Sequence, residues 1–358
     1  MKIRLIRYFP YFLFFYHLLF ACIAYDYVNR NNGDAVQYWF VGKNLNAIRW
    51  SDFLGPGTDA VKLITYPLVV FLKMPPLLGC VLFSMLSGYG FIRLWNLAKN
   101  TGNQHKYLPV VSALILLLPN AHFWTSLIGK ESLLFLPMVL LTEMIYKEKY
   151  YSVVGFISLL IIAWIRPHLA FVIVLALGIA LFWKGNLNRK AKTLWLAAGF
   201  LAVTGLCFLL QKLTHAQESL FLKIQNLYAA HNLKLKNTAA YVPLEDYVYP
   251  YKIFTFFFRP FPFEKEGMVY AIVGAEGLIG FLVFGLIFYT AVRCYQNISW
   301  SVSGLFSLIL LMAYATMYVY AYANFGMILR ARALLIPVIL IVVIQFFCPT
   351  APNRFKRF

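Results

Sequence analysis

The amino-acid sequence predicts an all-α bundle of transmembrane helices. Of its 358 residues, 61% are hydrophobic and only 13% are charged, and the mean hydropathy is +0.70. A soluble domain typically has about a quarter of its residues charged. Apolar stretches recur from residue 8 to residue 348 with short polar breaks. We therefore expect a single membrane domain over residues 1–358 and no separate soluble domain.

Ten apolar windows predict about ten membrane spans, which places both termini on the same side. A spanning helix needs roughly 20 apolar residues, and several windows are shorter. In chain order the windows cover residues 8–28, 77–95, 107–119, 131–146, 151–165, 169–183, 193–210, 268–291, 300–319 and 333–348. The stretch 63–72 is too short to cross and is followed by Lys73, Pro75 and Pro76. We expect it to lie at the membrane interface or to re-enter.

The first window follows a basic opening of Lys2, Arg4 and Arg7, as in a secretory signal. Because further spans follow, we expect an uncleaved anchor. With cytoplasmic termini, 16 Lys and Arg are packed into about 50 cytoplasmic residues, and the other 16 are spread over about 130 residues outside. Since basic residues concentrate in cytoplasmic segments, this density favours N and C termini in the cytoplasm.

Two extracytoplasmic loops follow from this topology, residues 29–76 and the larger 211–267. The larger loop holds an amphipathic stretch at 220–228 and then four prolines. We expect an interfacial helix followed by an extended aromatic segment. The formal net charge of +19 would suggest nucleic acid in a soluble protein. Here the basic residues lie at helix ends, so membrane lipid is the expected partner and nucleic acid is not.

The unusual polar groups fall almost entirely on the predicted outer face. Asp34 lies in GDAVQYW at residues 33–39, just beyond the first span. There it is a candidate general base near the membrane surface. The alternative is a solvated loop with interfacial aromatic side chains.

Lys130 is the second candidate, at the start of the fourth window. The Gly129-Lys130 pair suggests a phosphate loop, but that motif requires Gly where Trp124 stands and Ser or Thr where Glu131 stands. The sequence therefore holds no nucleotide loop. A Lys at this helix end is suited to hold an anion. The alternative is ordinary snorkelling of Lys130 toward the interface.

Arg166, Pro167 and His168 lie between two apolar runs of 15 residues each. Such a helix spans roughly 22 Å against about 30 Å of hydrocarbon. Arg166 and His168 therefore lie just below the outer headgroups or in a cavity, and Pro167 disfavours helical geometry at Arg166. An Arg at that depth costs roughly 2.5 to 3.5 kcal/mol, which makes Arg166 a candidate functional residue.

The later candidates surround the last three windows. Arg259 lies in FRPFPFE at 258–264, and Glu276 lies in the outer half of the following span. Three glycines at 274, 277 and 280 on that span predict close packing of the helix rather than a dinucleotide loop.

Arg330 and Arg332 follow NFG at 324–326, at the start of the last span. Two cations at a helix amino terminus oppose its macrodipole unless an anion sits there. Together with the backbone amides they would form a phosphate-binding site. The alternative is snorkelling of both side chains to lipid headgroups.

The sequence gives no indication of metal or serine-hydrolase chemistry. It has no HExxH, no paired His or Cys ligands, and no nucleophile elbow around its serines. We therefore expect no metal and no cofactor.

The motifs GDAVQYW at 33–39, WTSLIGKE at 124–131, RPH at 166–168, FRPFPFE at 258–264 and NFGMILRAR at 324–332 resemble those of bacterial polytopic glycan polymerases. These are the O-antigen (Wzy-like) and EpsG-like exopolysaccharide polymerases, themselves similar to the GT-C membrane glycosyltransferases. The likeness covers the whole chain in layout.

The resemblance implies a GT-C-like fold in the bacterial cytoplasmic (inner) membrane and a metal-free reaction on its outer leaflet. A glycan on polyprenyl diphosphate would be transferred to a sugar hydroxyl of another lipid-linked repeat. On this hypothesis Asp34 is the catalytic base, with Glu276 in reserve, and His168 and Trp39 position sugar. The expected diphosphate ligands are Lys130, Arg166, Arg259, Arg330 and Arg332. Other polysaccharide-assembly proteins are further candidate partners.

Two alternatives stay open at this point. One is a GT-C transferase that adds a single sugar from a polyprenyl-phosphate monosaccharide. The other is a transporter or flippase for a lipid-linked sugar, which would favour polar groups near the midplane and inverted repeats. The one-sided clusters and the lack of a visible repeat favour an enzyme.

Overall fold

The structure is a computed structural model that describes residues 2–31, 33–101, 107–185, 232–293 and 300–347, together with residues 188, 190, 193 and 226. The predicted span at 193–210 and the amphipathic stretch at 220–228 lie almost wholly outside these residues. Within them, regular secondary structure is helical, apart from one isolated bridge between Tyr241 and Asn324. The predicted all-α architecture is confirmed for the described part of the chain.

Helices coincide with every apolar window that the structure describes. They are α1 (Lys2–Asn31), α4 (Pro76–Thr101), α5 (Leu108–Leu116), α7 (Lys130–Tyr146), α8 (Val153–Ile165), α9 (Pro167–Lys184), α13 (Met268–Arg293), α14 (Val302–Ala321) and α15 (Phe325–Phe347). Six of these helices, α1, α4, α9, α13, α14 and α15, are long and apolar enough to cross a membrane. They indicate a multi-pass membrane protein.

The count of about ten spans is not confirmed. Helix α5 and the short α6 (Pro119–Ser126) add a seventh crossing if they form one broken span. Helices α7 and α8 have 17 and 13 residues, less than the roughly 20 that a bilayer requires.

Prolines mark the two sharp breaks in the bundle. Pro119 begins α6, and α5 and α6 are bent by 46°. Pro167 begins α9 directly after α8, and Arg166 between them has φ −139° and ψ 81°, outside the helical region. Because a proline disfavours helical geometry in the residue before it, the sequence predicts this break at Arg166. The structure confirms the break.

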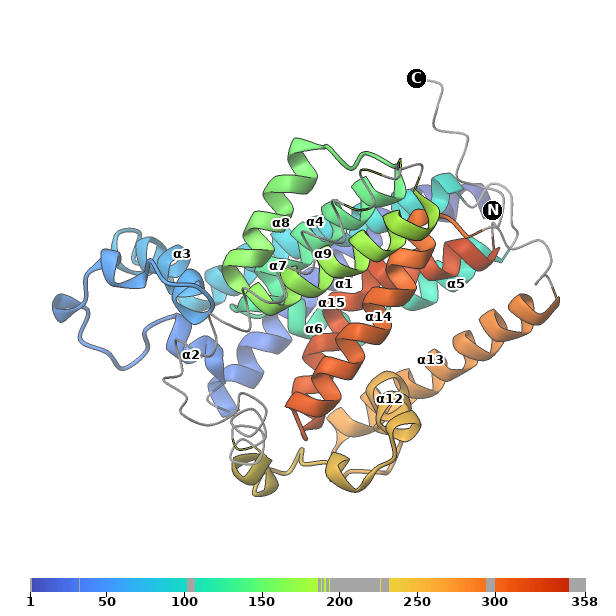
Figure 1. Ribbon diagram of the computed structural model, residues 1–358. Helices are drawn as coiled ribbons and strands as arrows, with labels where there is room; N and C mark the ends of the chain where they lie inside the picture. The colour runs from blue at the N-terminus through green and yellow to red at the C-terminus, as the bar shows by residue number, and fades with distance from the viewer. Residues whose placement is uncertain are drawn as a thin grey trace.

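The long helices run alongside one another, some up and some down, so their termini gather at two ends of the bundle (Figure 1). Helices α1, α6, α8 and α14 end at one of them, where α7, α9, α13 and α15 begin. We call this the site end. At the opposite end, Arg93 and Lys147 both pair with Glu143.

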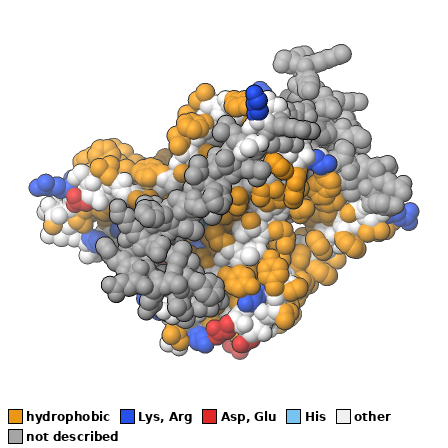
Figure 2. All heavy atoms as spheres, in the orientation of Figure 1, with side chains coloured by type: hydrophobic (Ala, Val, Ile, Leu, Met, Phe, Trp, Pro, Cys, Tyr) orange, Lys and Arg blue, Asp and Glu red, His pale blue; other side chains and the backbone are white. Residues whose placement is uncertain are grey.

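Helix α15 is central and α13 is peripheral. In α15, 78% of the most apolar 18-residue window is buried, and the helix packs against α5, α6, α7 and α14. The corresponding share of α13 is only 28%, and Figure 1 shows α13 leaning away from the bundle beside α12 (Tyr249–Phe258). Hydrophobic side chains dominate the exposed surface of the bundle (Figure 2), as expected for helices that face lipid.

The two loops at the site end contain short helices. The first holds α2 (Asp34–Tyr38), the 3-10 helices η1 (Leu45–Ala47) and η2 (Trp50–Phe53), and α3 (Thr58–Val70). Helix α3 covers most of the stretch expected at the interface, and its 13 residues are too few to cross. The described part of the second loop holds η4 (Leu244–Asp246) and α12.

Candidate functional site

Five charged side chains from four separate segments meet at the site end, and we call them the charged cluster. They are Asp34 of α2, Lys130 and Glu131 of α7, Arg166 between α8 and α9, and Arg330 of α15. Arg330 Nη1 lies 2.6 Å from Asp34 Oδ2, and Arg166 pairs with Glu131. Lys130 lies within electrostatic range of the other four. Four residues predicted from the sequence, Asp34, Lys130, Arg166 and Arg330, are thus brought together.

Arg166 is the most enclosed cation of the cluster. Its Nη2 donates to Glu131, and its Nη1 donates to the hydroxyls of Tyr314 at 3.2 Å and Tyr318 at 3.1 Å. Removing a charged side chain from water costs several kcal/mol. A buried charge is therefore stable only where polar partners surround it. The two tyrosines lie one turn apart on α14 and so face the same way. Arg166 is therefore occupied by protein partners.

Lys130 is different, because no described residue forms a hydrogen bond or ion pair with its half-buried ammonium group. Its Nζ faces Gly57, where an added Cβ would lie 3.8 Å away. Gly57 has φ +72°, a left-handed conformation that favours glycine over residues with a side chain. The space in front of the ammonium group therefore borders bare backbone. Within the described part of the cluster, Lys130 is the cation best placed to accept an external anion.

The Asp34–Arg330 pair forms the accessible rim of the cluster. The Asp34 side chain is 54% exposed, and that of Arg330 is 24% exposed. The Arg330 guanidinium lies 4.4 Å from the centre of a Trp124 ring, which makes a cation–π contact.

Tyr38 follows Asp34 by one helical turn and lies beside Gly129. Burial, followed by the negative charges of Asp34 and Glu131, raises the pKa of Tyr38 to about 12. The hydroxyl of Tyr38 therefore keeps its proton at neutral pH and remains a hydrogen-bond donor.

His168 and Trp39 lie at different distances from this cluster. His168 is exposed in the first turn of α9 and lies within electrostatic range of Arg166 and Lys130. Trp39 is only 4% exposed, and its ring packs where a Cβ on Gly79 would be. His168 is thus accessible beside the cluster, whereas Trp39 belongs to the hydrophobic core between α2 and α4.

The remaining predicted residues, Arg259, Glu276 and Arg332, form a second group. Arg332 donates to the backbone carbonyls of Phe257, at 3.1 Å, and Arg259. Glu276 accepts a hydrogen bond of 2.5 Å from the backbone N–H of Asn120. We expected Arg330 and Arg332 to bind one phosphate together, but they have different partners. Residues two positions apart on a helix point in directions that differ by roughly 200°.

Arg259 is held in place by its own loop. It pairs with Glu264, and its guanidinium lies 5.3 Å from the Tyr247 ring and 5.1 Å from the Tyr251 ring. Burial lowers the pKa of Arg259, but hydrogen bonds to Glu264 and Tyr247 outweigh it, so the pKa is raised above its ordinary value. Arg259 stays charged, and its carbonyl oxygen helps to position Arg332.

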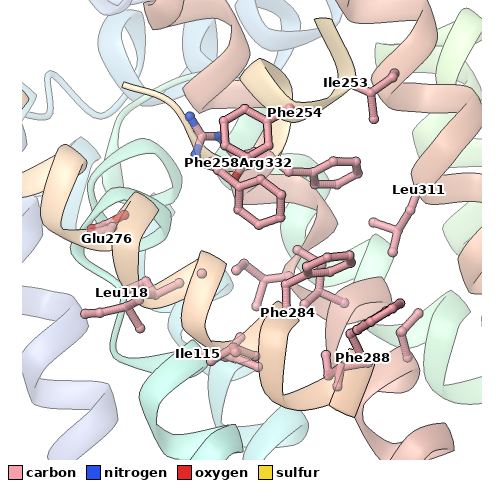
Figure 3. A pocket seen from close by; sticks show the side chains of 18 of the residues that line it. Ile115, Leu118, Ile253, Phe254, Phe258, Glu276, Phe284, Phe288, Leu311 and Arg332 are labelled. Carbon is pink, nitrogen blue, oxygen red and sulfur yellow. Dashed lines mark hydrogen bonds between the residues drawn. The ribbon is translucent and has the colours of Figure 1, made fainter. Parts of the chain in front are cut away.

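An apolar cavity of about 570 Å³ adjoins this second group. Helices α5, α6, α12, α13, α14 and α15 line it, and its polar side chains are Asn120, Glu276 and Arg332. Figure 3 shows Glu276 and Arg332. Helix α6 connects the cavity to the charged cluster. Asn120 bonds Glu276 on the cavity side, and Trp124, one turn later, contacts Arg330 on the cluster side. The two places are therefore neighbours across α6 and the start of α15.

Sequence reasoning missed Glu131, Tyr314 and Tyr318 as partners of Arg166, and Asn120 as the partner of Glu276. The spacing of the two tyrosines, four residues apart, did indicate a common helix face. Nothing in the sequence indicated that this face meets Arg166. The Asn120 contact is made by the backbone and leaves no signal in the residue type.

Among the described residues, no group of three or more His, Cys, Asp or Glu side chains is arranged to hold a metal ion. The chain matches no protein-family model, no curated protein sequence and no solved structure.

Proposed function

We propose that this protein is a metal-independent membrane glycosyltransferase of the polysaccharide-polymerase type. It would join polyprenyl-diphosphate-linked oligosaccharide repeats into a surface polysaccharide on the outer face of the bacterial cytoplasmic membrane. The observation that carries the proposal is the meeting of Asp34, Lys130 and Arg330, residues far apart in the sequence, at one end of a membrane bundle.

The charged cluster offers the groups that such a transfer needs. The acceptor sugar hydroxyl attacks the anomeric carbon of the donor glycan, forming the new glycosidic C–O bond. The bond between that carbon and the diphosphate oxygen breaks, and polyprenyl diphosphate leaves with the bonding electrons. Asp34, which is solvent-accessible and lies beside Arg330, accepts the hydroxyl proton.

Cations stabilise the charge that develops on the departing diphosphate. Lys130, which has no protein partner among the described residues, contacts one phosphate, and Arg330 turns from Asp34 toward the other. Exposed His168, beside the cluster, supplies a donor or acceptor for a sugar hydroxyl. Arg166 supports the site by fixing Glu131 beside Lys130.

The decisive experiment supplies purified protein with lipid-linked oligosaccharide and separates the products by size. We expect a ladder of extended chains. Lys130→Met should reduce the turnover number by about 10²-fold or more, as loss of one charge-stabilising donor does. Asp34→Asn should reduce it by about 10²- to 10⁴-fold.

Lys43→Met is the matched control, because Lys43 is exposed in the same loop region and lies outside the cluster. It should extend chains like the wild type. Full activity of Lys130→Met would exclude the proposed diphosphate contact. A single-step product would instead identify a GT-C transferase that uses a polyprenyl-phosphate monosaccharide. No product, with movement of the lipid between leaflets, would identify a transporter.

A further inference from the structure

The apolar cavity beside α13 is an elongated groove. It reaches from Glu276 to Ala291 along α13 and from Arg332 to Phe346 along α15. At 1.5 Å per residue, these stretches are each roughly 21 to 22 Å long. One leaflet holds about half of the 30 Å hydrocarbon core, or about 15 Å. The groove is therefore longer than one leaflet is thick.

The wall of the groove is almost wholly apolar. Six phenylalanine rings line it, at positions 254, 257, 258, 284, 288 and 346, with aliphatic side chains between them. Figure 3 shows Phe254, Phe258, Phe284 and Phe288 along its length. A site with this lining binds hydrocarbon and excludes polar chains.

The groove opens sideways toward the surface that faces lipid. Phe284 and Phe288 of α13 line the groove while 50% and 62% exposed, and Met312 on the α14 wall is 40% exposed. A hydrocarbon chain in the bilayer can therefore enter between α13 and α14 without crossing water.

Polar groups gather at one end of the groove, nearest the site end. There the carbonyls of Phe257 and Arg259 hold the two terminal nitrogens of Arg332. Its Nε is buried and has no hydrogen-bond partner among the described residues. The neighbouring carboxylate of Glu276 is already bonded to Asn120. An anionic head group would supply the missing acceptor for Nε.

We propose that this groove binds the single long chain of a polyprenyl phosphate lipid, with its phosphate beside Arg332. The choice of lipid class rests on the proposed function, and the fit rests on the groove itself. Phospholipid chains are matched to one leaflet and come in pairs, whereas the groove is longer than a leaflet and has one polar end. The lipid in the groove would be the acceptor repeat, whose phosphate stays beside Arg332 while the donor's departing diphosphate lies at Lys130 and Arg330. Its glycan would reach the charged cluster across α6.

The test measures binding of polyprenyl monophosphate to the full-length protein in detergent by native mass spectrometry. Gly280 lines the groove, and its nearest neighbour is a Phe258 ring atom 4.0 Å from an added Cβ, so Gly280→Trp should fill the space. We expect binding to weaken by about tenfold or more. Gly285→Trp is the control, because Gly285 is on the same helix, is exposed, does not line the groove and has nothing within 4 Å.

Met312→Trp enters the groove from α14 at a partly exposed position and should also weaken binding, so the test survives poor folding of Gly280→Trp. Equal binding by wild type, Gly280→Trp and Met312→Trp would overturn the proposal. Equally tight binding of phosphatidylglycerol, or of a polyprenyl phosphate shorter than one leaflet, would overturn it as well.

Asp34→Asn separates this proposal from the proposed function, because Asp34 is assigned to proton transfer and not to lipid binding. It should bind polyprenyl phosphate normally while extending chains about 10²-fold or more slowly than the wild type. Wild-type binding that follows the expected pattern, without any chain extension, would refute the function alone. Chain extension with binding insensitive to both groove variants would refute the groove alone.

Discussion

The buried Glu131–Arg166 ion pair should contribute to the stability of the bundle. Both side chains are about nine-tenths buried, and the pair is completed by Tyr314 and Tyr318. Glu131→Gln removes the negative charge and leaves the Arg166 cation without its counter-ion. We expect a loss of about 3 kcal/mol in the free energy of unfolding. Unfolding of the purified protein in detergent, followed by loss of helical signal, measures it.

The matched control is Glu245→Gln, which breaks the Lys236–Glu245 pair in the second loop. Both partners are 40% or more exposed, and exposed pairs contribute little to stability. This variant should unfold like the wild type. If Glu131→Gln were equally neutral, the buried pair would have no structural role, and Arg166 would be free to act on substrate.

The difference between buried and exposed ion pairs also decides which candidate residue gives the clearer functional test. Replacing Arg166 strands a buried Glu131, so any loss of activity mixes folding with chemistry. Replacing Lys130 breaks no hydrogen bond or ion pair among the described residues. Lys130 therefore gives the cleaner test of an anion contact.

At the scale of elements, the glycines of α13 decide how that helix docks. An added Cβ would lie 2.3 Å from the backbone at Gly274 and 2.2 Å from it at Gly277. The predicted close packing is confirmed at these two positions. At Gly280 the nearest atom is 4.0 Å away, so this glycine widens the groove instead.

Gly277→Ala should therefore push α13 away from the carbonyl oxygen of Phe258 and destabilise the protein by about 1 to 3 kcal/mol. Gly285→Ala is the same change on the same helix with no neighbour within 4 Å. It should be neutral or stabilise by up to about 1 kcal/mol through helix propensity. Thermal unfolding of both variants distinguishes these outcomes, and equal unfolding temperatures would exclude a tight contact at Gly277.

Helices and helix breaks were predictable from the sequence where neighbouring residues alone determine them. The apolar windows gave helices, and Pro167 gave the break at Arg166. The partners of each charge were not predictable, because they depend on which helices pack together. Arg330 and Arg332 illustrate this. Arg330 pairs with Asp34 of α2, and Arg332 donates to a carbonyl of α12, because α2 and α12 lie on different sides of α15.

At the scale of the whole molecule, charge and groove share one end of the bundle. The charged cluster and the polar end of the groove are separated only by α6 and the start of α15. The opposite end carries Arg93, Lys147 and their shared partner Glu143. For the proposed reaction, the site end has to face the outside of the cytoplasmic membrane.

The density of basic residues predicts that orientation, and single cysteines can test it. In a variant whose five native cysteines are replaced by serine, Lys43→Cys places a thiol in the exposed first loop at the site end. Lys149→Cys places one at the opposite end, after α7. A membrane-impermeant thiol reagent should label Lys43→Cys in intact cells and Lys149→Cys only after permeabilisation. Because cytoplasmic segments retain Lys and Arg, the reverse pattern would mean that the basic residues do not set the topology. The charged cluster would then face the cytoplasm, where a surface polysaccharide cannot be assembled by the proposed route.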